Sequence, residues 1–431
     1  MFRRLVCLAV LASLTTGCQD DDEQRGDEAG ETVVFRGARL VRGDGSILAD
    51  RGVLVVRDGR IAAVGREADV AAPDGATVVD LPGRTVVPGL INGHGHVGNT
   101  MGFESSPAFQ TRDNLSRQLR QYARFGVTTV VSLGGEGDAA ARLRDLSTGP
   151  LERARLRIAG PVITAATPEA ARRDVNRVAA LSPDFIKIRV DDNLGTTRKM
   201  PLEVARAVID QAHMHGIRVA AHIFYLDDAR ALVRAGVDLV AHSVRDQAVD
   251  AELISLLTSR RVCVVPTLAR EMSAFVYEGE PDFLRDPFLV AGLDASIVET
   301  LDDPARRPRP PTRETADRYR AALEVAGDNV GRLVDAGVGV AFGTDSGPPG
   351  RFQGYFEHLE LEMLVQAGLT PAEALASATR TTADCLGLPD AGDLVVGRWA
   401  DFVVLGANPL ADIRASRSIE SVWIGGRRVP R

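Results

Sequence analysis

Short apolar stretches rich in Val, Ile and Leu alternate with amphipathic helical patterns over most of the chain. Continuous apolar strands separated by helices are typical of parallel βαβ units, whose sheets are covered by helices. We expect eight such strands, at 86–92, 127–133, 156–163, 184–190, 218–222, 239–243, 262–268 and 339–344. Eight units predict an α/β fold of the (β/α)₈ TIM-barrel type. A doubly wound sheet is the alternative, but the GxGxxG motif of its dinucleotide-binding form does not follow the first strand.

The two ends of the chain have a different pattern, in which β-branched runs are separated by turn residues. The pair Asp58-Gly59 lies between two such runs and predicts a β-hairpin. Neither end is long enough to bury much surface by itself. We therefore expect residues 32–87 and 395–431 to form one small β-sandwich domain together.

The predicted barrel domain spans residues 88–394. The chain has 431 residues, which is enough for a barrel of roughly 250 residues and a smaller domain. Residues 271–315 interrupt the strand–helix alternation after the seventh strand and include the Pro-rich stretch RRPRPPT. Long insertions at this position are typically functional, so we expect a lid-like insertion at the rim of the barrel.

The first 17 residues resemble a bacterial lipoprotein signal peptide, with two arginines, an apolar run and small residues before Cys18. The apolar run, 5–14, is too short to span a bilayer. We expect cleavage before Cys18, lipidation of this cysteine, and export to the bacterial cell envelope, facing the periplasm or in the outer membrane. The alternative is an ordinary secretory signal in which Cys18 is incidental.

The formal net charge of −7 gives no indication of a nucleic-acid partner. Most of the acidity lies in residues 18–31, which are too polar to fold and are predicted to be an acidic tether. Membrane contact is expected only through the lipid anchor. After removal of the signal peptide and lipidation, Cys263 and Cys385 remain, and we expect both to be buried thiols without a disulfide.

Side chains that can bind a metal ion lie at the carboxyl ends of four of the predicted strands. They are His94, His96, His222, His242 and Asp345. His94 and His96 are two positions apart, so the strand period places both imidazoles on one side. Because catalytic groups of a TIM barrel lie at the carboxyl ends of its strands, we expect these five side chains to converge.

Lys187 lies inside the fourth predicted strand, in the otherwise apolar stretch DFIKIRV. A buried lysine can be explained by an ion pair with a neighbouring carboxylate. Alternatively, an unprotonated amine can add CO₂ and become a carbamate that bridges two metal ions. The surrounding histidines favour the carbamate, because four neutral imidazoles and one carboxylate poorly neutralise two divalent ions.

The order of several motifs resembles that of a known family. GRIAAVG, PGLINGHGH, FIKI, VAAH, AGVDLVAHS, FGTDSG and GDLVVGRWADFVVLGANPL follow one another along the chain. In this order the chain resembles the metal-dependent amidohydrolase superfamily, in the branch related to imidazolonepropionase and Xaa-Pro dipeptidases. The resemblance runs nearly from end to end. It implies a barrel with two divalent metal ions, most often zinc.

The resemblance also implies a role for each ligand. His94, His96 and Asp345 would hold one ion, His222 and His242 the other, and carboxylated Lys187 would bridge both. Asp345 would be the general base, accepting a proton as a metal-bridging hydroxide attacks a carbonyl and passing it to the leaving nitrogen. Asn92 departs from the pattern, because the family usually has Asp before the HxH motif. The stretch SGPPGRFQG after the last strand also departs from the family pattern. This second departure bears on the substrate specificity and not on the metal chemistry.

We therefore expect a hydrolase of carbon–nitrogen (amide) bonds in small substrates such as N-acyl amino acids, dipeptides or cyclic amides. Tyr225, Arg245 and Arg189 are predicted to bind the substrate at the rim of the barrel. The partner is a small molecule, and the resemblance is compatible with a homo-oligomer although no sequence feature requires one.

Three alternatives remain open. A mononuclear deaminase or cyclic-amide hydrolase would not need Lys187, although the Glu that deaminases carry after the fifth-strand histidine is absent after His222. An esterase or lactonase could use the same site. A ligand-binding lipoprotein without catalysis is the third alternative.

Overall fold

The computed structural model describes residues 32–301, 303–305, 307–308 and 312–430. The predicted signal peptide (1–17), the predicted acidic tether (18–31) and the predicted lipidation of Cys18 lie outside these residues. Within the described part, no helix is both long enough and apolar enough to cross a bilayer.

Two parallel sheets form the centre of the described chain, one with the order β10-β9-β6 and one with the order β11-β12-β13-β14. Their strands are β6 (Leu90–Gly95), β9 (Val127–Ser132), β10 (Arg155–Ile158), β11 (Phe185–Arg189), β12 (Arg218–His222), β13 (Leu239–Ala241) and β14 (Cys263–Val265). Each lies in or overlaps one of the first seven predicted apolar stretches. Of the expected eighth strand, 339–344, only an isolated bridge between Val340 and Val264 is present, and Ser346, just beyond it, bridges to Gly95.

Backbone contacts join the two sheets at both edges. Ile163 pairs in parallel with Ile188 at one edge. At the other edge, residues 339–344 lie between the sheets, because the Ala341 amide donates to Val264 and the Gly93 amide donates to Phe342, both over 2.8 Å. All these strands run in parallel, so their carboxyl ends lie on the same side.

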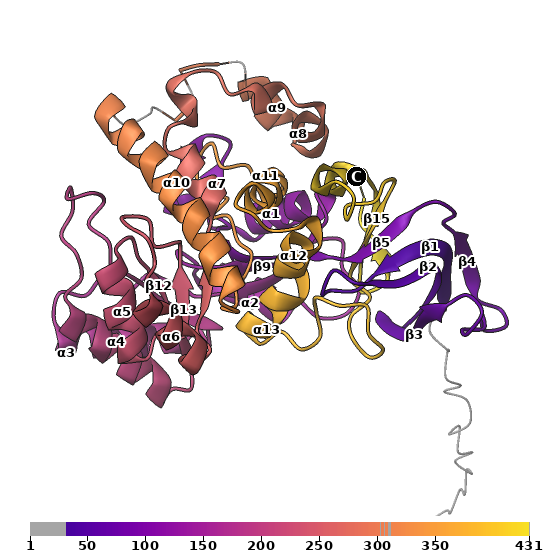
Figure 1. Ribbon diagram of the computed structural model, residues 1–431, viewed down its shortest axis with the longest axis horizontal. Coiled ribbons are helices and arrows are strands. Elements are labelled where there is room, and N and C mark those ends of the chain that lie inside the picture. Colours follow the sequence, from indigo (N-terminus) through magenta and orange to yellow (C-terminus); the bar gives the residue numbers. More distant parts are fainter. Residues whose placement is uncertain (1–31, 302, 306, 309–311, 431) are drawn as a thin grey trace, which may run out of the picture. The chain divides into compact units, whose positions relative to one another are not determined.

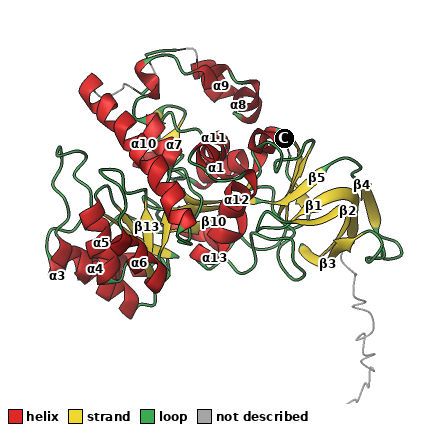
Figure 2. Cartoon of the chain, viewed as in Figure 1, coloured by secondary structure: helices red, strands yellow, loops and turns green. Residues whose placement is uncertain are grey.

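Helices follow the parallel strands and pack around them (Figures 1 and 2). They are α1 (Arg112–Arg124), α2 (Asp138–Asp145), α3 (Pro168–Ala179), α4 (Leu202–Met214), α5 (Leu226–Ala235), α6 (Ala251–Arg260), α10 (Arg313–Asp335), α11 (Tyr355–Gln366), α12 (Pro371–Ala376) and α13 (Thr382–Leu386). Local sequence fixes several ends: Thr167 caps α3 before Pro168, Thr370 and Glu373 form a capping box on α12, and Gly236 ends α5 at a φ of 99°.

The two terminal segments share one eight-stranded sheet with the order β17-β16-β15-β5-β1-β2-β3, and β4 pairs with β1. Its strands are β1 (Val33–Val41), β2 (Ile47–Arg57), β3 (Arg60–Arg66), β4 (Thr77–Asp80), β5 (Thr85–Pro88), β15 (Phe402–Leu405), β16 (Ile419–Ile424) and β17 (Arg427–Arg428). The predicted hairpin at Asp58-Gly59 is confirmed, because both residues have positive φ and connect β2 to β3. A sandwich of two facing sheets stays a prediction.

The segment predicted as a lid-like insertion, 271–315, contains α8 (Pro287–Gly292), α9 (Ala295–Leu301), the end of α7 (Leu268–Ser273) and the start of α10. A short antiparallel pair, β7 (Thr100–Met101) and β8 (Glu104–Ser105), follows β6. Leu289 and Ile297 of the insertion pack in one apolar cluster with Phe125 and Phe356. A role as a lid stays a prediction.

Cys263 and Cys385 form a disulfide, so the prediction of two separate thiols is wrong. The two residues are 122 positions apart in the sequence, but β14 and α13 bring their Cα atoms to 5.9 Å. Gly339 lies against both sulfurs, and a Cβ atom there would be 2.6 Å from Cys263 Sγ. The strand and helix patterns contain no signal for this proximity, which only the packing creates.

Candidate metal centre

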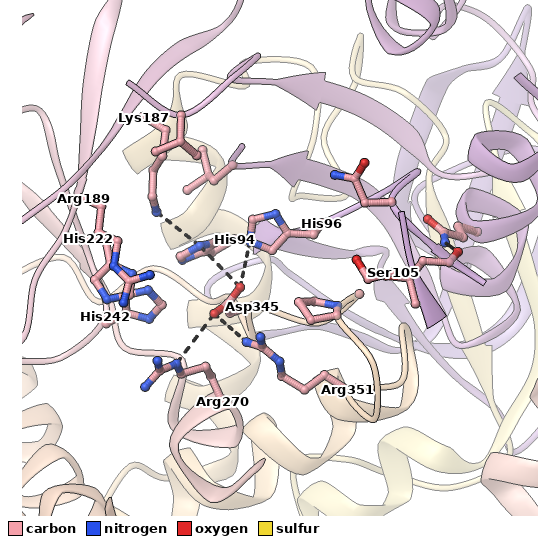
Figure 3. Close-up of a pocket in the computed structure, with 17 residues that line it drawn as sticks. His94, His96, Ser105, Lys187, Arg189, His222, His242, Arg270, Asp345 and Arg351 are labelled. Atoms are coloured by element: carbon pink, nitrogen blue, oxygen red, sulfur yellow. Dashed lines mark hydrogen bonds and ion pairs between the residues drawn. The ribbon is translucent and has the colours of Figure 1, made fainter. Parts of the chain in front are cut away.

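A cavity of about 310 Å³ lies at the carboxyl ends of the parallel strands. The six residues predicted as metal ligands, His94, His96, Lys187, His222, His242 and Asp345, all line it (Figure 3). His94 and Lys187 lie within β6 and β11, and His222 ends β12. His96 and His242 directly follow β6 and β13, and Asp345 follows residues 339–344. The convergence expected from the sequence is therefore observed in the structure.

The backbone at this site adopts conformations that are rare for residues other than glycine. His242, Thr267 and Asp345 have φ angles of 73°, 54° and 53°. Left-handed backbone at a non-glycine residue is unfavourable and occurs where the surrounding structure requires it, often at functional sites. Here it turns His242 and Asp345 into the cavity at the strand ends, and it places Thr267 Oγ1 2.6 Å from Nδ1 of His242.

Three of the four imidazoles contact, through one ring nitrogen, a group that is not a predicted metal ligand. Nδ1 of His96 lies 3.1 Å from the Gly134 carbonyl, and Nε2 of His222 lies 2.8 Å from Oδ2 of Asp191. His242 is held by Thr267. A second contact of this kind fixes the tautomer of a metal-binding histidine, so the other nitrogen of each ring remains available as a ligand.

The ring nitrogens that do not make these orienting contacts show whether the residues fit a metal ion. Nε2 of His242 and Nδ1 of His94 are buried and have no hydrogen-bond partner among the described residues. Nε2 of His96 lies 2.7 Å from Oδ1 of Asp345. Since the carbonyl of Gly134 can only accept, a neutral His96 presents a lone pair to a carboxylate oxygen. His94, His242 and Asp345 each offer one ligand atom within 4.8 Å of the others. A cation placed among these facing ligand atoms would satisfy them, so the donor set fits a metal.

The three innermost histidines are uncharged in this environment. Burial is the main cause that lowers the pKa of His94, His222 and His242, and that of His222 falls to about 3 despite its bond to Asp191. Neutral imidazole is the form that coordinates metal ions.

Lys187 has a deeply buried amine next to the histidines. Its Nζ lies 3.3 Å from Nε2 of His94, and within the described part of the chain no carboxylate forms an ion pair with it. The ion-pair explanation of this lysine is therefore not observed. Burial lowers its pKa to about 7, so the unprotonated amine is present near neutral pH. Glu136, buried nearby, has a pKa raised to about 7 by the same cause.

Asp345 is held by two arginines on the side opposite to the histidines. Arg351 Nη1 lies 2.6 Å from Oδ2, and Arg270 Nε lies 3.8 Å from the same oxygen (Figure 3). Burial would raise the pKa of Asp345, but Arg351 and His96 outweigh it and hold the pKa well below its usual range. The carboxylate is thus ionised, with Oδ1 directed toward His96.

The contacts of Asn92 explain why an amide stands at this position, where the family usually has Asp. Its Nδ2 donates to Oε1 of buried Glu357 over 2.5 Å, and its Oδ1 accepts from the His94 amide over 2.9 Å. Thr344 and Ser346 donate to the same glutamate oxygen, each over 2.7 Å. An aspartate in place of Asn92 would bring two carboxylates together, so the amide is matched to Glu357.

The predicted substrate residues have three different environments. Arg189 lines the cavity. Tyr225 is outside it and donates to Oδ1 of Asp192 over 2.8 Å. The rim position predicted for Arg245 is wrong, because its side chain is fully buried and pairs with the equally buried Glu271 over 3.1 Å. Arg245 follows His242 by three residues, but its side chain lies outside the cavity and donates to the carbonyls of Ile223 and Ser243.

Several residues that support the site were not predicted. They are Asp191, Thr267, Arg270, Arg351, Glu136 and Glu357. Asp191 directly follows the strand that carries Lys187 and Arg189, so its position at a strand end was a usable signal. Thr267 lies near the end of the predicted seventh strand, 262–268, so the same signal applied to it. The remaining four lie in loops or helices, and their side chains reach the site only through the tertiary packing.

The fold and the site define a metal-dependent hydrolase built on parallel strands. The amidohydrolase family model matches residues 85–429. The chain therefore belongs to the amidohydrolase family, which confirms the resemblance seen in the sequence. The members of this family imply an α/β fold of the TIM-barrel type and a hydrolase that uses a divalent metal and acts on carbon–nitrogen bonds.

Individual relatives are similar over most of the chain. Imidazolonepropionase of Deinococcus deserti is 26% identical over 422 residues, covering 88% of this chain and 92% of its own. Enamidase of Eubacterium barkeri is 29% identical over 206 residues, 44% of this chain and 50% of its own. Among solved structures, a putative prolidase from Bifidobacterium longum is 28% identical with a TM-score of 0.75, covering 94% of this chain and 95% of its own.

Proposed function

We propose that the protein hydrolyses the amide bond of small substrates such as N-acyl amino acids, dipeptides or cyclic amides, with two divalent metal ions. The observation that carries this proposal is the position of Lys187. Its buried amine lies 3.3 Å from His94, inside a cavity lined by four histidines and Asp345. A buried lysine with a purely structural role would need an anionic partner. A lysine that is converted to a carbamate ligand would instead need metal-binding side chains around it, as are present here.

We assign His94, His96 and Asp345 to one ion and His222 and His242 to the other, with Lys187 between them. His222 would coordinate through Nδ1, because Nε2 contacts Asp191. Zinc suits a set of histidine nitrogens and carboxylate oxygens, and it is the ion we propose.

Lys187 would join the ligand set as a carbamate. Its uncharged nitrogen forms a bond to the carbon of CO₂, one C–O π pair moves onto oxygen, and the nitrogen loses a proton to water. The product carries one negative charge on two oxygens and can bridge two cations. The pKa of about 7 supports this step, because it makes the free amine abundant at neutral pH.

Bound metal ions would supply a nucleophilic hydroxide at neutral pH and polarise the substrate carbonyl. The chain's own contribution is centred on Asp345, which accepts a proton from the attacking water and returns it to the leaving nitrogen. Arg351 and Arg270 hold Oδ2, so Oδ1 remains directed at the reacting groups. An amide suits this arrangement because its amine leaving group requires the returned proton.

The test is metal content and intact mass under native conditions, measured on the full-length protein. Lys187 and Lys199 are the only lysines in the sequence, so Lys199→Ala is a matched control. We expect two metal ions and one added CO₂ in the wild type and in Lys199→Ala. Lys187→Ala should lose the CO₂ and most of the metal. Full metal content and activity in Lys187→Ala would contradict the proposal.

A mononuclear hydrolase is the second candidate. It is favoured by the compact group of His94, His242 and Asp345, whose ligand atoms lie within 4.8 Å of one another. One ion per chain and no CO₂ adduct would support it. Ester or lactone hydrolysis on the same site would appear in a substrate panel that contains both carbonyl classes.

For the fold and location, we infer a closed eight-stranded barrel, a β-sandwich of the chain ends, and a lipid-anchored protein exported to the bacterial cell envelope. The bridges from Val340 to Val264 and from Ser346 to Gly95 support closure of the barrel.

The disulfide between Cys263 and Cys385 supports export, because disulfides persist in oxidising compartments. Labelling with a radioactive fatty acid, lost in Cys18→Ala, tests the anchor.

A further inference from the structure

A second cavity, of about 350 Å³, adjoins the metal centre. It is lined by residues 164–166 and by part of the loop that follows β11. Arg189 lines both cavities, so its side chain lies at their common boundary. Arg189 and Lys187 occupy one face of β11, because they are two positions apart on the strand.

Two arginines of the second cavity have unused hydrogen-bond donors. Arg189 directs Nη2 toward Asn193 and lies 3.5 Å from Oδ2 of Asp191, while its buried Nε has no partner. Arg198 also lines this cavity, is exposed, and contacts no described residue through a hydrogen bond or ion pair. A guanidinium has five N–H donors in a planar fork. Most of the donors of Arg189 and Arg198 therefore make no hydrogen bond to a described residue.

The acidic and basic groups nearby are already engaged. Asp191 contacts His222 over 2.8 Å and accepts from the Asn193 amide over 3.0 Å. Lys199 donates to Asp228 over 2.6 Å. Apart from the contacts of Arg189 Nη2 with Asp191 and Asn193, the donors of Arg189 and Arg198 in this cavity have no acceptor among the described residues. A carboxylate has the two coplanar oxygens that a guanidinium binds best.

We propose that the second cavity binds a carboxylate of the substrate, with Arg189 as the main contact and Arg198 as the outer one. A substrate that spans both cavities places its scissile amide at Asp345 and an acidic group beyond Arg189. Binding of a carboxylate in the second cavity does not depend on the proposed function. The inference rests on the proposed function only where it states that this carboxylate belongs to the amide substrate. Uncharged amides of the same length would be poor substrates.

The probe is succinate, compared with the uncharged succinamide, in calorimetric titrations of the full-length protein after removal of metal ions with a chelator. Without metal, a carboxylate cannot bind through the metal centre. We expect succinate to bind at least tenfold more tightly than succinamide. Arg189→Met should weaken succinate binding at least tenfold, Arg198→Met about threefold, and Arg189→Lys less than Arg189→Met. Arg173→Met, an exposed arginine on α3, should leave it unchanged.

Equal binding of succinate and succinamide would overturn the inference, as would no binding of either. If Arg351→Met lost succinate binding and Arg189→Met kept it, the anion would be in the first cavity, and this result would also overturn the inference. Amide hydrolysis by the metal-loaded enzyme separates the two proposals. Hydrolysis without succinate binding removes only the second site, and succinate binding without hydrolysis of any amide removes only the proposed reaction.

Discussion

The contact between Asn92 and Glu357 allows a prediction whose magnitude follows from the structure. Both side chains are buried, and Nδ2 of Asn92 lies 2.5 Å from Oε1 of Glu357. In Asn92→Asp, two carboxylates would face each other at this distance. Because like charges so close in a buried site disfavour double ionisation, the pair should retain one proton.

The cost of this proton depends on pH. At pH 7, holding a proton on a carboxyl group whose unfolded pKa is about 4.3 costs about 4 kcal/mol, at about 1.4 kcal/mol per pH unit. The folded-state pKa of the pair is raised, so the folded state loses stability as the pH rises above the unfolded value. Burial already raises the pKa of Glu357 in the wild type, so these costs are upper limits on the change. We therefore expect Asn92→Asp to lose up to about 4 kcal/mol at pH 7 and up to about 1 kcal/mol at pH 5.

Guanidinium unfolding of the metal-free protein at both pH values measures this difference. Glu357→Gln combined with Asn92→Asp restores one donor and one acceptor, so the double variant should recover at least half of the loss. Asn176→Asp, at an exposed position, is the control and should change the free energy of unfolding by less than about 0.5 kcal/mol. An equal loss at pH 5 and pH 7, or no recovery in the double variant, would refute the reasoning.

Three further variants test other parts of the structure. Replacing Cys263 and Cys385 with Ala should lower the free energy of unfolding by about 2–5 kcal/mol, measured in denaturant, because the disulfide closes a loop with a sequence separation of 122. Glu271→Gln should cost about 3–5 kcal/mol in the same assay, because it leaves Arg245 as an unpaired buried charge; an effect below 1 kcal/mol would contradict this. Arg351→Gln should reduce kcat on an amide substrate about tenfold to a hundredfold with unchanged metal content, because Asp345 loses an orienting contact. An unchanged kcat would argue against that role.

Much of the site could be predicted from the sequence because its ligands occupy the ends of strands. Parallel strands deliver their carboxyl ends to one side of a sheet, so a residue's position at a strand end predicts its neighbours in space. His222 and His242 follow this rule directly. Lys187 was identified for a second reason, because a lysine in an apolar strand needs a special environment.

Side chains on turns and helices did not follow such a rule. Arg245 is only three residues from His242, yet it is buried outside the cavity, paired with Glu271. Arg351 and Arg270 reach Asp345 from the loop before α11 and from α7. The direction of a side chain in a turn depends on backbone angles that its neighbours impose, and the sequence pattern carries little of that information.

The sequence by itself determined the alternation of strands and helices, the hairpin at Asp58-Gly59 and the six candidate metal ligands that line the cavity. These features depend on local periodicity and on the common direction of parallel strands, which act over a few residues at a time. The tertiary structure alone decided the disulfide between Cys263 and Cys385, the pairing of Asn92 with Glu357 and the two arginines on Asp345. Except for Arg351 and Asp345, these contacts join residues far apart in the chain, and all of them exist only because tertiary packing places the two side chains against each other.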